Sequence, residues 1–578
     1  MQSGQEMFTH NSLCIAMLQT QSLMRLRIVD ILIIAIYFVL VIFIGFYLRQ
    51  SARTSKDFFL AGREMTAWIA GISFISANLG SLELMGWAGS AYQYGMLAAH
   101  AYWIGAVPAM LFLAIVMMPF YYVSKTHSVP GYLQLRFGNA ARGLSAITFA
   151  VMTILMSGIN MYAMALVMRI VLGWNLNFGI WVASLTVAVY VTLGGLRSAI
   201  FNEVLQFFLI WLGILTVSIL GLIEVGGLNK LRDQIIVNLG RPDYVHLWST
   251  LGHFRSNPMG VHWTGVIFGW GLVLSFSYFT TDFLVIQRTL SARNLRAAQL
   301  VPVIGAAFKM AVPLIVILPG MLALCVLPYH FVGETAAVGT AQHSYNEVLP
   351  LMMVRYCGPG MLGLGVTALI AGFMSGMAGN TSAFSTVWTY DIYGAFINRR
   401  ATEKHYVNMG RASALLGVFV SIGTAYLVQH SASIMDYAVQ LMSFFIAPLF
   451  ATVLLGMLWQ RATNAGGFWG LLIGICTSVG LWAWVRHTPT ALRYVALSSD
   501  AKDMAENMYR ALWSWIVAII VTVAVSYCTK PRPASELAGL VYGATELPPD
   551  TDARWYQRPG FWAITVGLVF IVINIVFW

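Results

Sequence analysis

Fourteen apolar stretches make up most of this chain of 578 residues. A stretch of about 20 apolar residues crosses a bilayer as a helix, because the backbone must satisfy its polar groups within the segment. Only 10% of the residues are charged, whereas soluble proteins have about 25%. The sequence therefore predicts an all-α, multi-pass protein of the cell membrane, embedded in the lipid bilayer. The expected spans are 28–48, 66–92, 96–122, 142–172, 177–194, 198–225, 262–287, 301–328, 359–396, 408–428, 434–458, 466–486, 510–528 and 560–578.

Lysine and arginine gather in the short loops between these spans. Basic residues are more frequent in cytoplasmic loops than in outside loops, and this bias sets the orientation. Placing the N-terminus outside gives the inside loops the larger share of Lys and Arg. The net charge of +11 thus reflects membrane topology, and we expect no nucleic-acid partner.

The stretch 66–92 is unsuited to being a plain membrane anchor. Its middle holds Asn78, Gly80, Ser81 and Glu83. A carboxylate at the centre of a span costs about 2.5–3.5 kcal/mol on insertion scales, and glycine weakens a helix by about 1 kcal/mol relative to alanine. We expect the helix to break here and to turn polar groups toward a cavity. The alternative is a close helix–helix contact, which explains the small residues but not the carboxylate.

A second span of this kind comes five spans later and runs in the opposite direction. The stretch 262–287 carries Gly269, Gly271, Ser275 and Ser277 in its middle. Two interrupted spans of opposite direction are typical of transporters with inverted repeats. The predicted organisation is an N-terminal segment 1–27, an extra helix and inside loop 28–65, a first repeat 66–225, an outside loop 226–261, a second repeat 262–458, and three C-terminal helices 459–578 with an inside linker 529–559.

Several sequence blocks between about residue 29 and the end of the chain form a recognisable combination of motifs. They are Asp57-Phe58-Phe59-Leu60-Ala61-Gly62-Arg63, Ser76-Ala77-Asn78-Leu79-Gly80-Ser81, Val129-Pro130-Gly131-Tyr132, Tyr190-Val191-Thr192-Leu193-Gly194-Gly195-Leu196 with Glu203 and Gln206, Thr281-Asp282 with Gln287-Arg288, and Asp391-Ile392-Tyr393. With these blocks the chain resembles the sodium/solute symporter family, which includes the sodium–glucose cotransporters. The resemblance implies a core of five-plus-five inverted repeats, with one helix before it and further helices after it.

The resemblance also implies a sodium site between the broken first core helix and the eighth. Its ligands would be the carbonyl groups of Ser76, Leu79 and Gly372 and the side chains of Ser375 and Gly376. Gly376 has no hydroxyl group, so one expected oxygen is missing. Three readings stay open: water or Thr381 replaces it, another ion such as the proton couples, or coupling is lost. Sodium as the coupling ion is the expectation, with no other cofactor.

Glu203 stands where the family has an aspartate near the ion path. A carboxylate there attracts a cation over a distance. The alternative is an inside-facing acid at the start of a helix, where negative charge is favoured.

The implied solute site lies at mid-membrane. Its residues would be Asn78, Glu83, Tyr102, Ser275, Tyr278, Lys309 and Val439. Because an unpaired buried charge is expensive, we expect Glu83 and Lys309 to pair, directly or across the solute. The alternative for Lys309 is a bond to helix carbonyls or to Asp282. Tyr278 would act as an inner gate and donate to Asn78; alternatively, it is an ordinary interface aromatic.

The sequence thus predicts a secondary active transporter that couples a cation to a small polar solute, with a sugar-like solute favoured. Tyr102 replaces an acid and Val439 an amide of the sugar carriers, so an amino acid or organic acid stays an alternative. A transporter-like membrane sensor is a third possibility. An enzyme is not expected, because an intramembrane protease would need a motif such as H-E-x-x-H, and the chain has none.

Overall fold

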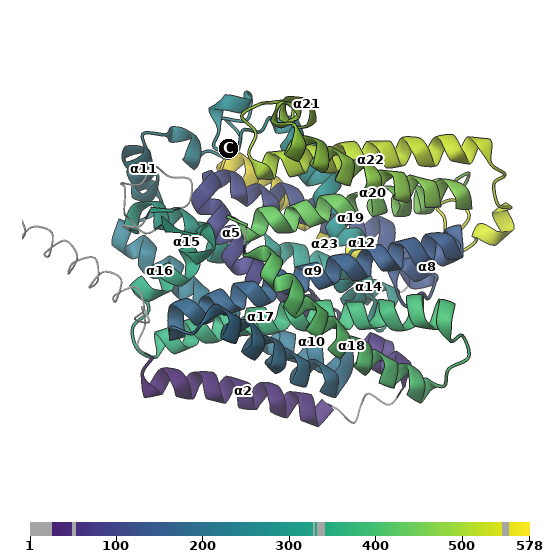
Figure 1. Cartoon of the computed structure of the whole chain (residues 1–578), viewed down its shortest axis with the longest axis horizontal. Coiled ribbons are helices and arrows are strands. Elements are labelled where there is room, and N and C mark those ends of the chain that lie inside the picture. Colours follow the sequence, from purple (N-terminus) through teal and green to yellow (C-terminus); the bar gives the residue numbers. More distant parts are fainter. Residues whose placement is uncertain (1–25, 49–53, 328–329, 332–341, 430, 546–553) are drawn as a thin grey trace, which may run out of the picture.

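The structure is a computed structural model that describes residues 26–48, 54–327, 330–331, 342–429, 431–545 and 554–578. Nearly all of these residues are helical (Figure 1). Two short strands, β1 (His330–Phe331) and β2 (Gln342–His343), pair in parallel. Almost all of the predicted N-terminal segment, and part of the predicted inside linker, lie outside the described residues.

The first half of the chain contains the broken span and the long kinked element α10. Its α-helices are α2 (Ile28–Leu48), α3 (Ser55–Leu60), α4 (Ala67–Ala77), α5 (Ser81–Tyr94), α6 (Val107–Phe112), α7 (Met118–Val123), α8 (Val129–Phe137), α9 (Asn139–Leu172), α10 (Leu176–Val225) and α11 (Leu228–Leu239). Short 3-10 or π segments are η2 (Ala61–Arg63), η3 (Gly95–Ala101), η4 (Tyr102–Ala106), η5 (Leu113–Met117), η6 (Pro242–Val245) and η7 (Phe254–Ser256).

The second half begins with a π-helix, η8 (Gly265–Ser275). Its α-helices are α12 (Phe276–Thr281), α13 (Phe283–Leu290), α14 (Leu295–Lys309), α15 (Pro313–Val326), α16 (Val348–Tyr356), α17 (Met361–Thr386), α18 (Glu403–Val428), α19 (Ile434–Leu458), α20 (Asn464–His487), α21 (Leu492–Val495), α22 (Asp503–Cys528) and α23 (Pro559–Val576). The other short segments are η9 (Tyr345–Glu347), η10 (Val387–Ile397), η11 (Pro489–Ala491), η12 (Ala534–Leu537) and η13 (Trp555–Gln557). In Figure 1, α2 and α22 lie at opposite edges of the bundle, and α9 and α17 run between them.

The first core span is broken where the sequence predicts it. Helix α4 ends at Ala77 and α5 begins at Ser81. Gly80 is extended, with φ −64° and ψ 168°, and the side-chain amide of Asn78 donates to the carbonyl of Phe74 at 2.7 Å. The break leaves the carbonyl groups of Asn78 and Leu79 outside the helical ladder, as in the interrupted helices of transporters that bind ions at mid-membrane.

The second interrupted span breaks later than its glycines and serines predict. The bend of 50° falls between Thr281 and Phe283, and the carboxylate of Asp282 caps α13 by accepting from the backbone N–H of Leu284 at 2.9 Å. The stretch with Gly269 stays helical, because that glycine provides close packing instead: a Cβ atom there would lie 2.6 Å from the carbonyl oxygen of Met508.

Every predicted span falls on helix, but the number fourteen stays a prediction. Length and apolarity alone give 11 helices able to cross a membrane, or up to 12 with the bent pair, among the described residues. Two shorter apolar helices, Ala67–Ala77 and Leu176–Ala188, are counted apart. The range of α10 contains two predicted spans, which meet at a kink at Gly195, whose φ of 61° suits glycine.

The loops assigned to the inside contact one another. Arg63 donates to the carbonyl of Thr126 at 3.0 Å, and the hydroxyl of Tyr132 donates to the carbonyl of Leu540 at 2.8 Å. Leu540 belongs to the predicted linker, whose described part packs against the bundle and includes the short helix η12. One face of the bundle therefore joins the segments that the orientation places inside.

The loops assigned to the outside meet at the other end. Asn346 donates to the carbonyl of Ala432 at 3.4 Å, and the rings of Trp248 and Trp578 stack with centroids 5.8 Å apart. The carboxylate of Asp30, near the start of α2, accepts from the backbone N–H groups of Gly360 and Gly363 at 2.8 and 2.7 Å. These contacts follow the alternation of spans that the sequence predicts.

Candidate functional site

One cavity lies beside the break between α4 and α5. It has a volume of about 110 Å³, enough for several waters or one small solute. Its walls are formed by residues of α4, α5, α9, α12, α13, α14, α17 and α19, with η3, η4 and η8. All seven residues predicted for the solute site line this cavity: Asn78, Glu83, Tyr102, Ser275, Tyr278, Lys309 and Val439.

Glu83 is the centre of the polar contacts in the cavity. The ammonium of Lys309 lies 2.7 Å from its Oε1 atom, so the predicted pair is direct. The hydroxyl of Tyr102 donates to the same oxygen at 3.0 Å, and the indole N–H of Trp87 donates to Oε2 at 3.2 Å. The side chain of Lys309 is only 3% exposed. Three donors therefore stabilise a carboxylate that would otherwise be costly at this depth.

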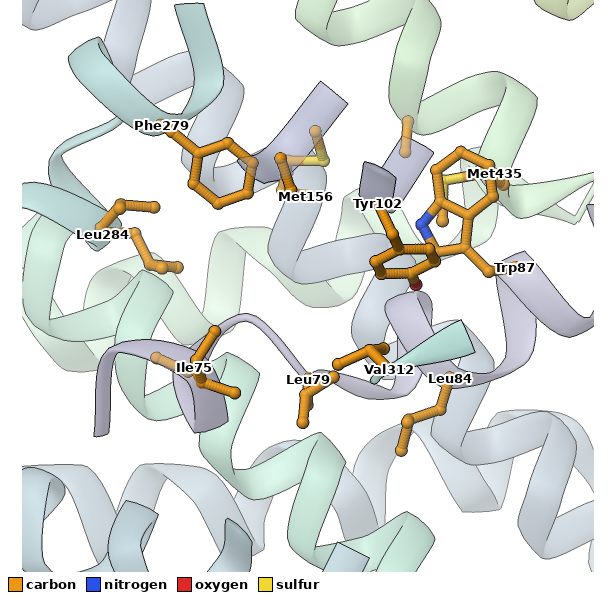
Figure 2. Close-up of a cluster of buried hydrophobic side chains, with 14 of the residues drawn as sticks. Ile75, Leu79, Leu84, Trp87, Tyr102, Met156, Phe279, Leu284, Val312 and Met435 are labelled. Atoms are coloured by element: carbon orange, nitrogen blue, oxygen red, sulfur yellow. The ribbon is translucent and has the colours of Figure 1, made fainter. Parts of the chain in front are cut away.

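The aromatic side chains around Glu83 pack as a group. The rings of Trp87 and Tyr102 lie 5.9 Å apart, side by side in Figure 2, and Trp87 meets Trp270 edge to face at 5.5 Å. The ammonium of Lys309 also lies 5.1 Å above the ring of Tyr102. Neither tryptophan is among the site residues that the sequence predicts. The signal for Trp87 was its position four residues after Glu83, on the same helix face.

The predicted hydrogen bond from Tyr278 to Asn78 is not formed. The amide nitrogen of Asn78 is turned back onto α4 to donate to Phe74, and its Oδ1 atom is buried without a partner. Tyr278 is half-buried in the cavity wall and meets Phe279 edge to face at 5.0 Å. The structure thus places the tyrosine at the cavity, as expected for a gate, but does not join it to the amide.

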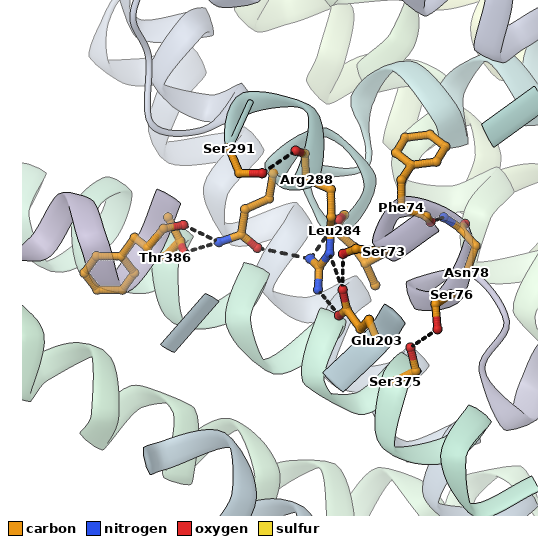
Figure 3. A network of polar contacts seen from close by, with 12 residues as sticks. Ser73, Phe74, Ser76, Asn78, Glu203, Leu284, Arg288, Ser291, Ser375 and Thr386 are labelled. Atoms are coloured by element: carbon orange, nitrogen blue, oxygen red, sulfur yellow. Dashed lines mark hydrogen bonds and ion pairs between the residues drawn. The ribbon is translucent and has the colours of Figure 1, made fainter. Parts of the chain in front are cut away.

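The residues predicted for the cation site also lie together, where the break contacts α17. The hydroxyl groups of Ser76 and Ser375 are 3.1 Å apart and fully buried (Figure 3). Gly372 faces Leu79 closely: a Cβ atom on this glycine would lie 2.8 Å from the carbonyl oxygen of Leu79. This place offers hydroxyl and carbonyl oxygens, the ligands that small hard cations prefer.

Gly376 is in tight contact with the broken helix. A Cβ atom at this position would lie 3.0 Å from the Cα atom of Gly80 and 3.3 Å from the side-chain oxygen of Asn160. That oxygen accepts from the hydroxyl of Ser81 and the backbone N–H of Leu82, both at 3.2 Å. Asn160 thus caps the first turn of α5. Its signal in the sequence is that it is the only amide side chain in the predicted span 142–172.

We expect Gly376→Ala to lower the free energy of unfolding by about 1–3 kcal/mol, because the added methyl group meets backbone that cannot move aside cheaply. Gly423 in α18 has nothing within 4 Å of an added Cβ atom, so Gly423→Ala is a matched control. That control should stabilise the protein by about 1 kcal/mol. Thermal unfolding of both purified variants tests this, and equal stability of the two would contradict the contact.

Glu203 lies in a buried ion pair that the sequence did not predict. Arg288 donates to its two oxygens, at 2.5 Å through Nη2 and 3.4 Å through Nε, and neither side chain is exposed. The hydroxyl of Ser73 donates to the same carboxylate (Figure 3). Ser73 lies three residues before Ser76, so this ion pair sits one helical turn from the candidate cation site.

Within the described part of the chain, no group of three or more His, Cys, Asp or Glu side chains is placed to hold a metal ion. The cavity walls combine the Glu83–Lys309 ion pair and the carboxylate of Asp282 with amide, hydroxyl and indole groups. Such a set can bind a polar solute by hydrogen bonds and can accommodate a small cation beside it.

Comparison with known proteins agrees with this reading. A model of the "sodium:solute symporter family" matches residues 58–474. The chain is 28% identical to the sodium/glucose cotransporter 4 of Danio rerio over 89% of this chain and 81% of the relative. It is 28% identical to the sodium/mannose cotransporter SLC5A10 of Bos taurus, over 96% and 97%, and 29% identical to the sodium/myo-inositol cotransporter 2 of Oryctolagus cuniculus, over 88% and 78%.

A solved structure of a Na+-coupled sialic acid symporter, in a substrate-bound outward-open state, superposes with a TM-score of 0.70. The likeness covers 87% of this chain and 99% of that one at 18% identity, and it shows the fold. The fold class is therefore the predicted one, an all-α membrane protein with an inverted-repeat transporter core. Because the family model covers more than half of the sequence, this chain belongs to the sodium:solute symporter family.

Proposed function

We propose that this protein carries a small, polar, sugar-like solute across the cell membrane together with a sodium ion. The observation that carries the proposal is the cavity at the break between α4 and α5, whose solute-facing residues adjoin the oxygen atoms around Ser76 and Ser375. Two ligands that bind on either side of one broken helix can each favour the conformation that binds the other.

The Glu83–Lys309 pair favours a neutral solute, and the carboxylate of Asp282 in the cavity wall accepts from the backbone N–H of Leu284. Glu83 and Lys309 neutralise each other at 2.7 Å. A solute rich in hydroxyl groups can donate to the unpartnered Oδ1 atom of Asn78 and accept from the unpartnered indole N–H of Trp270. Relatives named for glucose, mannose and myo-inositol transport agree with such a solute.

The sodium ion would bind between the break and α17. We assign it the carbonyl groups of Ser76, Leu79 and Gly372 and the hydroxyl of Ser375. Gly376 contributes close contact with Gly80 in place of a ligand, and water or Thr381 completes the oxygen set. Glu203 is compensated by Arg288, so its proposed effect on the ion path is to fix α10 against α4, more than to attract cations.

The transport cycle follows from this placement. Sodium binds from outside and stabilises the outward-open state, and the solute then binds beside it. The two repeats rock about the site and expose it to the inside. Each ligand raises the affinity for the other. The inward sodium gradient can therefore supply the energy for solute accumulation.

An amino acid is the second candidate, favoured by the ion pair itself. A zwitterion could separate Glu83 from Lys309 and pair its amine with the first and its carboxylate with the second. A sugar would instead leave that pair intact and bind to its outer oxygen and nitrogen atoms. The two candidates therefore differ in what they require of the pair.

A thermal-shift panel tests the proposal. The purified protein is heated with sugars, polyols, amino acids or carboxylates, each with sodium chloride or with choline chloride. A ligand at 100 times its Kd stabilises by about 2.7 kcal/mol, so the solute should raise the melting temperature, and more so with sodium. Stabilisation that is equal in both salts would contradict sodium coupling, and stabilisation by amino acids alone would favour the second candidate.

Removing the hydroxyl of Ser375 should weaken sodium binding. We expect Ser375→Ala to raise the sodium concentration for half-maximal stabilisation by about tenfold. One contact as strong as a hydrogen bond contributes about 1 kcal/mol or slightly more, and about 1.4 kcal/mol corresponds to a factor of ten. Ser385→Ala is the matched control, because that buried hydroxyl of the same helix already donates to the carbonyl of Gly410 at 2.7 Å. An unchanged sodium dependence in Ser375→Ala would remove this residue from the site.

A further inference from the structure

A second cavity, larger than the solute cavity, lies where the outside loop 226–261 meets the C-terminal end of α23. Its volume is about 680 Å³, within the range of pockets that bind small molecules. Its walls come from α11, α15 and α23, with η3, η4, η6 and the loop that follows η6. In Figure 1, α11, α15 and the C-terminus lie at the same end of the bundle. None of the residues around this cavity lines the solute cavity.

Apolar side chains make up most of the wall of this outer cavity. Leu314, Leu318 and Met321 line it from one face of α15, and these seven residues of helix extend the wall over about 10 Å. This face belongs to the predicted span 301–328, between the middle of the span and its outer end. Leu314 is 49% exposed, so the cavity is open on the side that faces lipid. An acyl chain is the apolar group that the bilayer offers at this depth.

Basic and polar side chains gather at the other end of the cavity. Arg232 of α11 and His246 after η6 both line it, together with Asn229 and Ser249. Burial lowers the pKa of His246, and the positive charge of Arg232 lowers it further, so the two groups lie close together. No Asp or Glu side chain lines the described part of this cavity. The outer cavity therefore has a cationic end that calls for an anion.

Trp103 connects the outer cavity with the neighbourhood of the solute site. Its ring lies 5.1 Å from that of Phe577 at the end of α23, and both residues line the outer cavity. Its indole N–H donates to the carbonyl of Met310 at 3.1 Å. Trp103 directly follows Tyr102, and Met310 directly follows Lys309. One wall residue thus holds together η4, α23 and the segment between α14 and α15.

We propose that the outer cavity binds one phospholipid with an anionic head group, whose phosphate contacts Arg232 and His246 and whose acyl chain lies along α15. A guanidinium matches a phosphate through two parallel N–H groups, and the imidazole adds a further donor. Basic pockets between transmembrane helices recognise lipid head groups. A sterol leaves Arg232 without an anion, and a free phosphate leaves the apolar wall unfilled. The bound lipid stabilises the junction that Trp103 holds.

Native mass spectrometry of the purified protein tests this site. The protein in detergent is titrated with phosphatidylglycerol or with phosphatidylcholine of the same acyl chains, and phosphatidylglycerol should bind more tightly. Arg232→Gln should raise the apparent Kd for phosphatidylglycerol by about tenfold, because a charge-assisted contact is lost. Lys230→Gln is the matched control, since it removes the same charge from an exposed position of α11 that does not line the cavity.

A change in the apolar wall tests the acyl chain independently of charge. Leu314→Trp adds bulk at the lipid-facing opening and should weaken the binding of phosphatidylglycerol severalfold. Leu416→Trp is the control, because Leu416 of α18 is 48% exposed and lies outside the cavity. Unchanged binding in Leu314→Trp would overturn the placement of the acyl chain. Equal affinity for the two phospholipids, or for phosphatidylglycerol in Arg232→Gln and the unmodified protein, would overturn the head-group site.

Thermal unfolding measures whether the lipid stabilises the junction around Trp103. A ligand that binds only the folded state raises its stability, so phosphatidylglycerol should raise the melting temperature of the unmodified protein and of Lys230→Gln. The melting temperature of Arg232→Gln should change much less. An equal rise in all three proteins would contradict stabilisation through this cavity. Neither measurement needs solute or sodium, so the lipid site is decided separately from the proposed transport.

Discussion

Glu83→Gln should abolish solute accumulation and lower the free energy of unfolding by about 3–5 kcal/mol. The substitution removes the charge that neutralises Lys309, whose side chain is 3% exposed. A buried ammonium without a counterion is the costly product. The substitution also removes the carboxylate that accepts hydrogen bonds from the hydroxyl of Tyr102 and the indole N–H of Trp87. Uptake into proteoliposomes and thermal unfolding measure the two effects.

The double variant Glu83→Gln/Lys309→Gln separates stability from transport. It leaves no unpaired charge, so most of the lost stability should return, whereas transport should stay absent because the solute has lost its charged partners. Tyr102→Phe is the milder comparison, since it removes a single hydrogen bond to the carboxylate. Wild-type transport in Glu83→Gln would contradict the assignment of the cavity as the solute site.

Arg288→Met should leave little folded protein. The guanidinium is fully buried and donates to both oxygens of Glu203, so its removal leaves a carboxylate in the core without a counterion. Breaking such a pair costs about 3–5 kcal/mol, a large part of the 5–15 kcal/mol that stabilises a typical protein. The fraction of monodisperse protein after extraction in detergent measures the effect.

Arg197→Met is the matched control for this pair. Arg197 lies 3.2 Å from Glu64, and the two side chains are 31% and 62% exposed. Exposed ion pairs contribute about 0–1 kcal/mol, so this variant should be extracted like the unmodified protein. Equal yields from Arg288→Met and Arg197→Met would show that the buried pair does not hold the fold.

The sequence predicts those parts of the site in which a single residue is energetically unfavourable inside a membrane helix unless the structure compensates for it. Gly80 and Glu83 in the middle of a span are expensive in an unbroken helix, and the break is found there. A buried lysine needs a counterion, and Lys309 has Glu83. In both cases the free energy of a single buried group limits the possible structures strongly.

The parts that the sequence misses depend on contacts between distant residues. Glu203 and Arg288 are 85 residues apart, and nothing local to either names the other as its partner. In the sequence, Gly376 is interpreted as a missing hydroxyl ligand, whereas the structure shows a close contact with Gly80 that a side chain would crowd. The second break falls at Asp282 because that carboxylate caps α13. The glycines and serines before it place the predicted break too early.

The central claim is that a sodium gradient drives a small polar solute through the cavity at Glu83 and Lys309. The most direct measurement is uptake of the radiolabelled solute found by the thermal-shift panel, in proteoliposomes with an inward sodium gradient, an inward proton gradient or neither. The account predicts accumulation above equilibrium with sodium only, and its loss in Glu83→Gln. Equal uptake under all three conditions, or accumulation driven by protons alone, would contradict it.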